Sequence, residues 1–485
     1  MATTRTGPRQ SHLRLGQARF DMTPPVGIYH RLWGAARHDR ATGVHRPLVA
    51  DLIAVGALGE ERHRFLRLEL DLCGLMQPWV DELRAAVAGA AGVAPGDAIV
   101  TFSHTHSAGW LFDPARHGLP GGELVRPYVA ELAERAARAA DQAVRAMSEA
   151  WIAYGAGRCA MLANRDYRDQ ARGLYACGYN PDAPADETVV VARATDRDGR
   201  LVATFVNYGC HPTTLAWENS LLSPDYVGAL RAEVERVTSA PCVFLLGACG
   251  DQGPRVGYVG DTAVADRNGR QLAHAALAVL EGLDPPATEL AYRGPVVSGA
   301  TLGDWRHEPL SDARRARAER VAGGAATVDL PLRSKPDRAG LEAEVERRLA
   351  EVRAAEARGD LAAARDAGAM VERARRWLGR LDELPDGQTL PLPFAVYRLG
   401  EALWVTCAAE PYSRIQTDLR ARFPDWTILF SPLAGEVQVA YLLPRDRYGA
   451  GLYQEEPSIL APGCLERLTD AIAERIALLV GDSAG

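Results

Sequence analysis

Two histidines in the stretch Ser103–Ser107 are spaced for chemistry. His104 and His106 are separated by one threonine and follow the apolar run 98–100. Alternate residues of a strand point to the same side, so two imidazoles at this spacing can face one point at a strand end. Neutral imidazole is a common ligand of divalent zinc. The pair also fits ordinary surface or core histidines, and a metal site needs further ligands from elsewhere in the chain.

Other polar residues also come directly after apolar runs. This group consists of Asp71, His104, His106, His211, Asp251 and Glu410. In α/β proteins ligands bind at the carboxyl ends of the strands, which is where such residues gather. Their shared position therefore favours a metal site over a set of unrelated surface residues.

Each member of the group also has an ordinary structural interpretation. Asp251 lies in a glycine-rich segment and could be a turn residue. Glu410 could be a carboxylate at a helix N-terminus, and His211 could be a loop histidine. The segment 247–253 also suggests a phosphate-binding loop, but it lacks the lysine and the spacing of a P-loop. The metal-site hypothesis depends on the whole group rather than on any one member.

The hydropathy pattern predicts an α/β fold, with a mixed sheet core and flanking helices. Apolar residues at helical spacing predict helices over residues 78–92, 126–147, about 227–237 and 465–480. Apolar runs of strand type occur between them, at 48–58, 65–72, 188–193, 201–207, 242–246, 395–399, 403–407 and 427–430. The runs 188–193 and 201–207 are joined by a turn sequence and predict a β-hairpin.

Residues 305–390 differ in composition from the rest of the chain. Apolar residues repeat at helical spacing in two series, 341–352 and 371–381, and the opposite faces are rich in arginine and glutamate. This pattern predicts an antiparallel helical hairpin with solvated outer faces. We interpret 305–390 as an insertion that covers the site or forms a subunit contact of a homo-oligomer.

Charge and composition exclude several classes of function. The 485-residue chain carries 55 basic and 62 acidic residues, a net charge of −7, which disfavours nucleic-acid binding. No apolar run is long enough to span a bilayer. The N-terminal segment lacks the apolar stretch of a signal peptide, so we expect a cytoplasmic protein without membrane association. The eight cysteines are scattered, with no CxxC pair, and we expect them to be reduced.

A series of short motifs resembles the catalytic domain of the neutral ceramidase family. In order, the motifs are Asp21-Met-Thr-Pro-Pro25, Gly43-Val-His-Arg-Pro-Leu48, Ser103-His-Thr-His-Ser107, Asn164-Arg165, Asn180-Pro181, Asn207-Tyr-Gly-Cys-His211, Gly250-Asp251, Ala409-Glu410-Pro411 and Ala440-Tyr441-Leu-Leu-Pro444. Each motif is short, but the ordered set is specific. The set extends over nearly the whole chain.

The resemblance implies a ceramidase-like zinc hydrolase domain made of residues 13–300 and 391–485. Carried over to the matching positions, it implies that the zinc ligands are His104, His211, Glu410 and Tyr441. His106 would face the substrate carbonyl, and Arg165 would assist at the same oxygen. Such roles are chemically sound, because bound zinc polarises a carbonyl and activates water, while a nearby imidazole or guanidinium stabilises the oxyanion.

Three further residues have less defined roles. Tyr441 rests on the resemblance alone, because a phenolate is an unusual zinc ligand. Asp71 and Asp251 are candidates for outer partners of the metal ligands, or for ligands of a second ion. The sequence identifies no substrate-binding residue.

Two departures from the family pattern bear on the substrate. The family has a serine where this chain has Gly253, so a serine nucleophile is not available there and a zinc-activated water remains. The chain ends about forty residues after Tyr441, without the immunoglobulin-like C-terminal domain of full-length ceramidases. We therefore expect a soluble substrate rather than membrane ceramide.

The resulting hypothesis is a zinc-dependent hydrolase that cleaves an amide bond of a soluble small molecule. One alternative is acyl transfer, or amide or ester chemistry in a biosynthetic pathway, on the same zinc site. Another is a non-catalytic binding protein with this fold. A TIM-barrel amidohydrolase also uses an HxH pair, but it needs further ligands on later strands, and neither His274 nor His307 follows a strand-like run.

Overall fold

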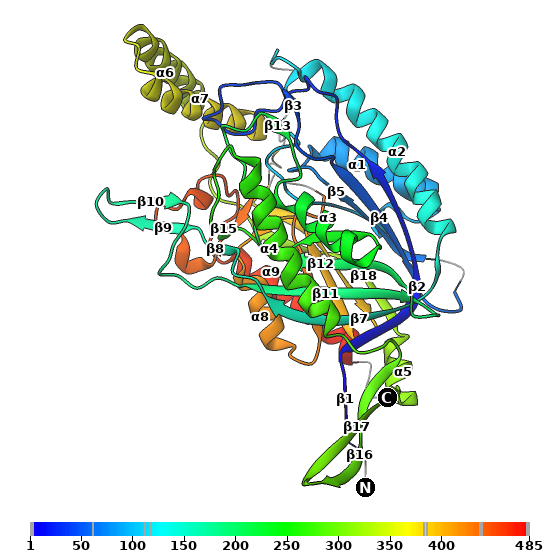
Figure 1. Cartoon of the computed structure of the whole chain (residues 1–485). Coiled ribbons are helices and arrows are strands. Elements are labelled where there is room, and N and C mark those ends of the chain that lie inside the picture. Colours follow the sequence, from blue (N-terminus) through cyan, green and yellow to red (C-terminus); the bar gives the residue numbers. More distant parts are fainter. Residues whose placement is uncertain are drawn as a thin grey trace.

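Two β-sheets pack face to face, and helices cover their outer sides, which makes four layers (Figure 1). The computed structural model describes residues 4–60, 63–110, 113–115, 118–381, 384, 387–435 and 440–481. The predicted α/β fold with a mixed sheet core and flanking helices is confirmed.

The larger sheet has eight strands in a linear order. In that order they are β14 (Cys242–Leu246), β12 (Leu201–Tyr208), β11 (Thr188–Asp196), β7 (Ser148–Arg158), β2 (Arg9–Asp21), β4 (Val49–Gly56), β5 (His63–Leu70) and β6 (Ala98–Phe102). β12 runs parallel to β14, β5 runs parallel to β6, and the other neighbours are antiparallel. A sheet of this order and mixed direction is not a TIM barrel, so that alternative is ruled out.

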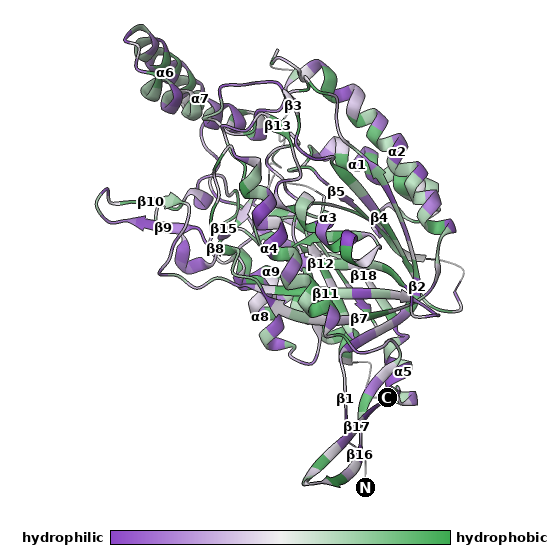
Figure 2. Ribbon diagram, in the orientation of Figure 1, coloured by the Kyte–Doolittle hydropathy of each residue, from purple (hydrophilic) through white to green (hydrophobic). Residues whose placement is uncertain are grey.

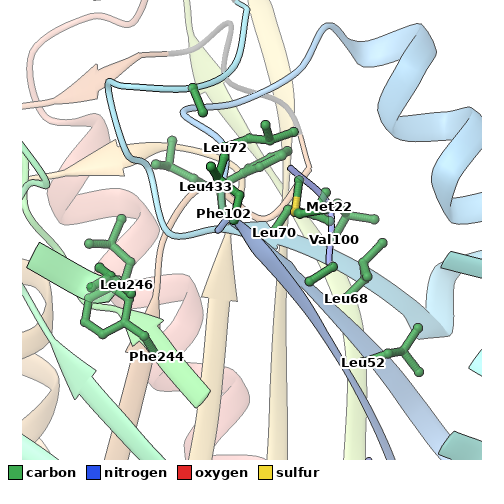
Figure 3. Packing of buried hydrophobic residues seen from close by; sticks show 14 of the residues in the cluster. Met22, Leu52, Leu68, Leu70, Leu72, Val100, Phe102, Phe244, Leu246 and Leu433 are labelled. Carbon is green, nitrogen blue, oxygen red and sulfur yellow. The ribbon is translucent and has the colours of Figure 1, made fainter. Parts of the chain in front are cut away.

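Four helices cover the outer face of the larger sheet. They are α1 (Gln77–Ala91), α2 (Val125–Arg145), α3 (Tyr226–Thr238) and α4 (Thr262–Glu281). Val80, Leu83 and Val87 line one side of α1 and are buried against the sheet, as their spacing predicts. Each such side chain contributes about 1.5–3 kcal/mol when fully buried. Figure 3 shows this core around Leu68 and Phe102, and Figure 2 shows hydrophilic residues alternating with hydrophobic ones along α2 and α4.

The smaller sheet closes the other side of the core. Its strands are β18 (Val321–Pro331), β19 (Thr389–Leu399), β20 (Ala402–Cys407) and β22 (Thr427–Ser431), and its outer face packs on α8 (Arg414–Arg422) and α9 (Cys464–Gly481). Aromatic rings join the two sheets. The ring of Phe65 lies 4.1 Å from that of Tyr397, and the ring of Phe205 lies 5.4 Å from that of Trp404.

The helical hairpin consists of α6 (Arg338–Ala357) and α7 (Leu361–Leu381), close to the two apolar series. The segment before α6 was predicted as part of the hairpin, and this prediction is wrong. Residues 305–331 complete β17 (Ala300–Pro309) and form α5 (Asp312–Ala318) and β18. β17 pairs with β16 (Thr288–Ser298) in a projecting arm, and β18 is built from small residues, so neither has a strong apolar signal. The division of the chain into domains stays a prediction.

No helix within the described ranges is both long and apolar enough to cross a membrane.

Short strands complete the loops at one end of the sheets. They are β3 (Gly43–Val44), β8 (Leu162–Asn164), β9 (Asp166–Asp169), β10 (Leu174–Cys177), β13 (Leu221–Leu222), β15 (Gln252–Pro254), β21 (Glu410–Pro411) and β23 (Tyr441–Leu442). β1 (Arg5–Thr6) instead pairs with β16 in the projecting arm. β15 pairs with β8, and β21 pairs with β23. These two pairs bring together four of the motifs described above.

A buried ion pair ties the end of β5 to α3. Oδ2 of Asp71 accepts a hydrogen bond of 2.5 Å from Nη1 of Arg231 and another of 3.0 Å from the backbone N–H of Val49. Among the described residues, Asp71 belongs to neither of the two groups of histidine, cysteine and acidic residues that could hold a metal ion. Its sequence-based role as a partner of a metal stays a prediction, and its observed role is to hold sheet and helix together.

We predict that Arg231→Ala destabilises the protein by about 3–5 kcal/mol, because it leaves the Asp71 carboxylate buried without its partner. The matched control is Arg236→Ala on the same helix, which removes an exposed pair with Glu233 and should leave stability nearly unchanged. Urea unfolding measures both. Equal effects of the two substitutions would contradict the role assigned to the buried pair.

Candidate metal centre

His104 lies just beyond the end of β6 in a backbone conformation with φ of 66°. Its Nδ1 lies 2.5 Å from the carbonyl oxygen of Cys73. Because a carbonyl only accepts hydrogen bonds, Nδ1 carries the proton and Nε2 has a free lone pair. This is the arrangement in which a second polar group orients a metal-binding imidazole.

His211 follows β12 and is fully buried. Its backbone N–H donates to the carbonyl oxygen of Gln252 at 3.2 Å. Its Nδ1 lies 3.1 Å from Oε1 of Glu410, but without the alignment of a hydrogen bond. The ring thus presents Nδ1 to the same point that Nε2 of His104 faces.

Glu410 opens β21, and its backbone N–H donates to the carbonyl oxygen of Ala440 at 2.8 Å. Its Oε2 lies 3.6 Å from Nε2 of His104. The side chain is only 3% exposed, so it faces the two imidazoles in a buried setting. The carboxylate therefore completes a set of three ligand atoms from three distant parts of the chain.

The three residues fit a divalent metal ion. One ligand atom of each lies within 4.8 Å of the others. Nε2 of His104, Nδ1 of His211 and Oε1 of Glu410 are buried and have no hydrogen-bond partner among the described residues. Buried polar atoms are nearly always paired, so three unpaired ones that converge indicate a shared partner. Two imidazoles and a carboxylate are a ligand set of catalytic zinc sites.

The electrostatic surroundings act differently on the three ligands. Burial opposes protonation of His104, but Cys73 and Glu410 outweigh it and raise its pKa well above the usual value, so a metal ion has to displace a proton there. Burial, followed by the charge of Arg165, lowers the pKa of His211 to about 3. Burial opposes ionisation of Glu410, but His211 and His104 outweigh it and hold the pKa of its carboxyl well below the usual range. At neutral pH the centre therefore offers a neutral imidazole at His211 and a carboxylate at Glu410, which are the states that bind metals.

His106 borders the centre without joining the three converging atoms. Its Nε2 lies 2.9 Å from Nε2 of His211, so one of the two nitrogens donates to the other. Burial, followed by the neighbouring His211 and His104, lowers its pKa well below the usual range. His106 also forms a second candidate group with Cys73 and His104, but the Nδ1 of His104 is bonded to the Cys73 carbonyl.

Arg165 is buried beside the ligands. Its Nε and Nη2 donate to the carbonyl oxygen of Gly250 at 3.1 and 2.8 Å, and Nη2 lies 3.6 Å from Oε1 of Glu410. Burial opposes the charge, but Cys177 and Tyr441 lead the groups that raise the pKa of the guanidinium further above its usual value. A fixed positive charge thus adjoins the metal ligands.

Tyr441 reaches the site through backbone pairing. It lies opposite Glu410 in the parallel register of β21 and β23, and its ring lies 5.4 Å from the guanidinium of Arg165. Burial, followed by the Glu410 carboxylate, raises the pKa of the phenol well above its usual value. The residue is therefore close to the centre as a neutral phenol, and its role as a fourth ligand stays a prediction.

Asp251 supports the segment that follows Glu410. Its carboxylate accepts hydrogen bonds from the backbone N–H of Ser413 at 2.6 Å and from the Ser413 hydroxyl at 2.9 Å. The backbone carbonyl of Asp251 accepts from the N–H of Arg165 at 2.9 Å. The residue thus connects two site segments, and a second ion at this position stays a prediction.

Gly253, where the ceramidase motif has a serine, has room for a side chain. A Cβ at Gly253 would lie 3.7 Å from both the Cδ of Arg165 and the Oγ1 of Thr213, which is ordinary contact. Glycine is therefore not required here by space. Gly253 places bare backbone beside Arg165 where a hydroxyl would otherwise stand.

Aromatic residues that the sequence did not single out surround the centre. The ring of Trp33 lies 5.1 Å from that of His106, 5.7 Å from Tyr258 and 6.3 Å from Trp217. Tyr453 lies 5.9 Å from Tyr441. These residues are on loops without regular spacing, so hydropathy carries no signal for them. Cys73, by contrast, follows an apolar run, and the rule used for Asp71 would have found it.

His30 fixes the loop that carries Trp33. Its Nε2 lies 3.2 Å from the carbonyl oxygen of Ser107 and 3.1 Å from that of Leu221, so this nitrogen carries the proton. Its Nδ1 accepts from Nε2 of His38 at 3.0 Å. Burial, followed by His38, lowers the pKa of His30 to about 4.

The architecture has known counterparts. No family model and no curated protein matches the sequence. The neutral ceramidase from Pseudomonas aeruginosa matches with a TM-score of 0.64 and 16% identity, over 97% of this chain and 74% of that one. The chain has a ceramidase-like fold. A structure titled as ceramidase complexed with C2 matches with a TM-score of 0.62 and 15% identity, over 97% and 75%. The fold expected from the ordered motifs is confirmed, and the chemistry rests on the residues of the centre.

We predict one bound metal ion per chain and separable effects of the two neighbouring histidines. His211→Ala removes a ligand and should lower metal affinity by more than about 100-fold. His106→Ala should keep the metal, because the converging atoms do not include it. The control is His274→Ala, which removes an exposed histidine away from the centre. Elemental analysis and zinc titration measure the result, and equal metal loss from the His106 and His211 variants would refute the ligand assignment.

We also predict that acid weakens the metal-free fold partly through His30. The folded pKa of about 4 lies below the unfolded value, so the unfolded chain binds the proton first as pH falls. Stability is therefore lost between about pH 6.5 and pH 4, by up to about 1.4 kcal/mol per pH unit. Urea unfolding of the chelated protein at pH 7 and pH 5 should show a smaller loss for His30→Gln than for the wild type. An identical loss would contradict this account.

Proposed function

We propose that the chain is a zinc-dependent hydrolase that cleaves an amide bond of a soluble small molecule. The observation that supports this most is the convergence of three unpaired, buried ligand atoms from His104, His211 and Glu410. His106 and Arg165 adjoin this centre as a neutral imidazole and a fixed cation. A hydrolytic metal site needs a base and a positive charge of this kind beside the ligands.

Zinc bound at this centre would polarise the substrate carbonyl and lower the pKa of its water. His106 would face the substrate carbonyl, where an imidazole can stabilise the oxyanion or protonate the leaving nitrogen. Its lowered pKa makes the protonated form a good acid, which suits protonation of the leaving nitrogen. Arg165, anchored to the carbonyl of Gly250, stabilises the negative charge that forms on the carbonyl oxygen.

The choice of a soluble amide rests on charge and on the site. The net charge of −7 opposes approach to an anionic bilayer. With glycine at position 253 there is no side-chain nucleophile at the place where a serine would stand beside Arg165. Direct attack by water is therefore favoured over an acyl-enzyme route. Acyl transfer to an amine is the principal alternative outcome.

The proposal is tested with zinc-loaded protein on N-acyl amino acids, N-acyl amino sugars and detergent-dispersed ceramide. We expect release of a free amine from a soluble amide, with little action on ceramide. Mass spectrometry of the products, with and without added amine acceptors, separates hydrolysis from acyl transfer. Cleavage of ceramide alone would overturn the substrate class, and absence of any amide turnover by metal-loaded protein would overturn the proposed reaction.

We predict that Arg165→Ala lowers kcat by about 10²–10³-fold while metal content is retained, because it removes the charge that stabilises the oxyanion. Arg168→Ala is the matched control, since Arg168 lies three residues further along the same segment and is exposed. Steady-state kinetics on the best substrate measures both variants. Similar kcat values for the two variants would contradict the role of Arg165.

A further inference from the structure

Helix α7 holds a loop that borders the metal centre. Nη2 of Arg376 donates to the carbonyl oxygen of Leu32 at 2.5 Å, and Nε of Arg31 lies 3.5 Å from Oε1 of Glu372. A Cβ at Gly34 would lie 3.0 Å from the Cα of Ala369, so the loop backbone approaches the helix as closely as glycine allows. The loop is thus fixed to α7 at three successive points.

The same helix holds a second loop on the other side. Nε1 of Trp377 donates to Oε1 of Glu456 at 2.8 Å, and Nη1 of Arg380 donates to the carbonyl oxygen of Pro457 at 2.7 Å. Trp377 is 9% exposed and packs in the core of the smaller sheet. One turn of α7 therefore connects two segments that lie more than four hundred residues apart in the chain.

Each of these loops places an aromatic ring at the centre. The first loop carries Trp33, whose ring lies 5.1 Å from His106. The second loop carries Tyr453, whose ring lies 5.9 Å from Tyr441. Trp33 also packs against Trp217 and Tyr258 in T-shaped contacts, so these rings form one aromatic cluster. Both loops are thus in direct contact with α7.

A groove lies beside the segment that follows Trp33. It has a volume of about 550 Å³, and Trp217, His38 and Arg365 are among its lining residues. Arg365 belongs to α7, so this helix forms part of the groove wall as well. The volume is that of a small-molecule site. Trp217 connects the groove to Trp33 and through it to His106.

We propose that α7 is the specificity element of the site. By fixing the loops of Trp33 and Tyr453, it sets the aromatic walls that receive the groups on either side of the scissile bond. This favours amides that carry a planar, ring-sized group, because such a group stacks on fixed aromatic faces. The inference rests on the proposed function. Arg376 and Trp377 are positioning residues in it, since they act through the loops rather than on the substrate.

The positioning role is tested first without any substrate. Hydrogen exchange of zinc-loaded protein should be faster at residues 31–34 in Arg376→Ala and at 453–457 in Trp377→Phe, while residues 98–106 stay unchanged. The matched control is Arg375→Ala, because Arg375 is the adjacent residue of α7 and is exposed. Unchanged exchange in both loops, or equally faster exchange throughout the chain, would overturn the positioning role, whatever reaction the protein catalyses.

The specificity role is tested by comparing a small N-acetyl amide with one that bears an aromatic ring beside the carbonyl. Arg376→Ala and Trp377→Phe should lower kcat/KM for the ring-bearing amide by about 10- to 100-fold, mainly through KM, and leave the small amide within about threefold. Metal content should not change. Equal losses on both amides would overturn the specificity role. Lack of turnover by the wild type would instead refute the proposed function and leave the exchange result standing.

Discussion

The rest of the site depends on three buried ligand atoms that face one another without hydrogen-bond partners. An unpaired buried polar atom costs about 1–3 kcal/mol, so the arrangement at His104, His211 and Glu410 is unfavourable unless a cation binds there. The surrounding structure is organised to maintain it. The Cys73 carbonyl orients the first imidazole, the pairing of β21 with β23 places the carboxylate, and Asp251 supports the segment that follows.

The sandwich of two sheets explains how such distant residues meet. His104 and His211 follow strands of the larger sheet, and Glu410 follows a strand of the smaller one. Because the sheets pack face to face through rings such as Phe205 and Trp404, their strand ends are held at a fixed distance. Similarity to ceramidase structures at about 16% identity shows that this architecture tolerates wide sequence change.

Sequence reasoning was most effective where a local rule acts. The apolar spacing of α1 and α9 and the position of His104 after a strand follow from periodicity and from where strands end. It was less effective where contacts between distant parts of the chain determine the structure. β18 is a strand of small residues that is recognised only by its pairing with β19. Trp33 lies beside His106 on a loop that both His30 and α7 contact. The role of the Asp251 carboxylate also could not be predicted from the sequence, because its partner Ser413 lies far away in the chain.

The central claim is that one divalent ion binds among His104, His211 and Glu410. Anomalous diffraction from zinc-soaked crystals, recorded above and below the zinc absorption edge, tests it most directly. The account predicts a single strong anomalous peak per chain, bounded by Nε2 of His104, Nδ1 of His211 and a carboxylate oxygen of Glu410. A peak bounded instead by Cys73 and His106, or no peak at the three converging atoms, would contradict it.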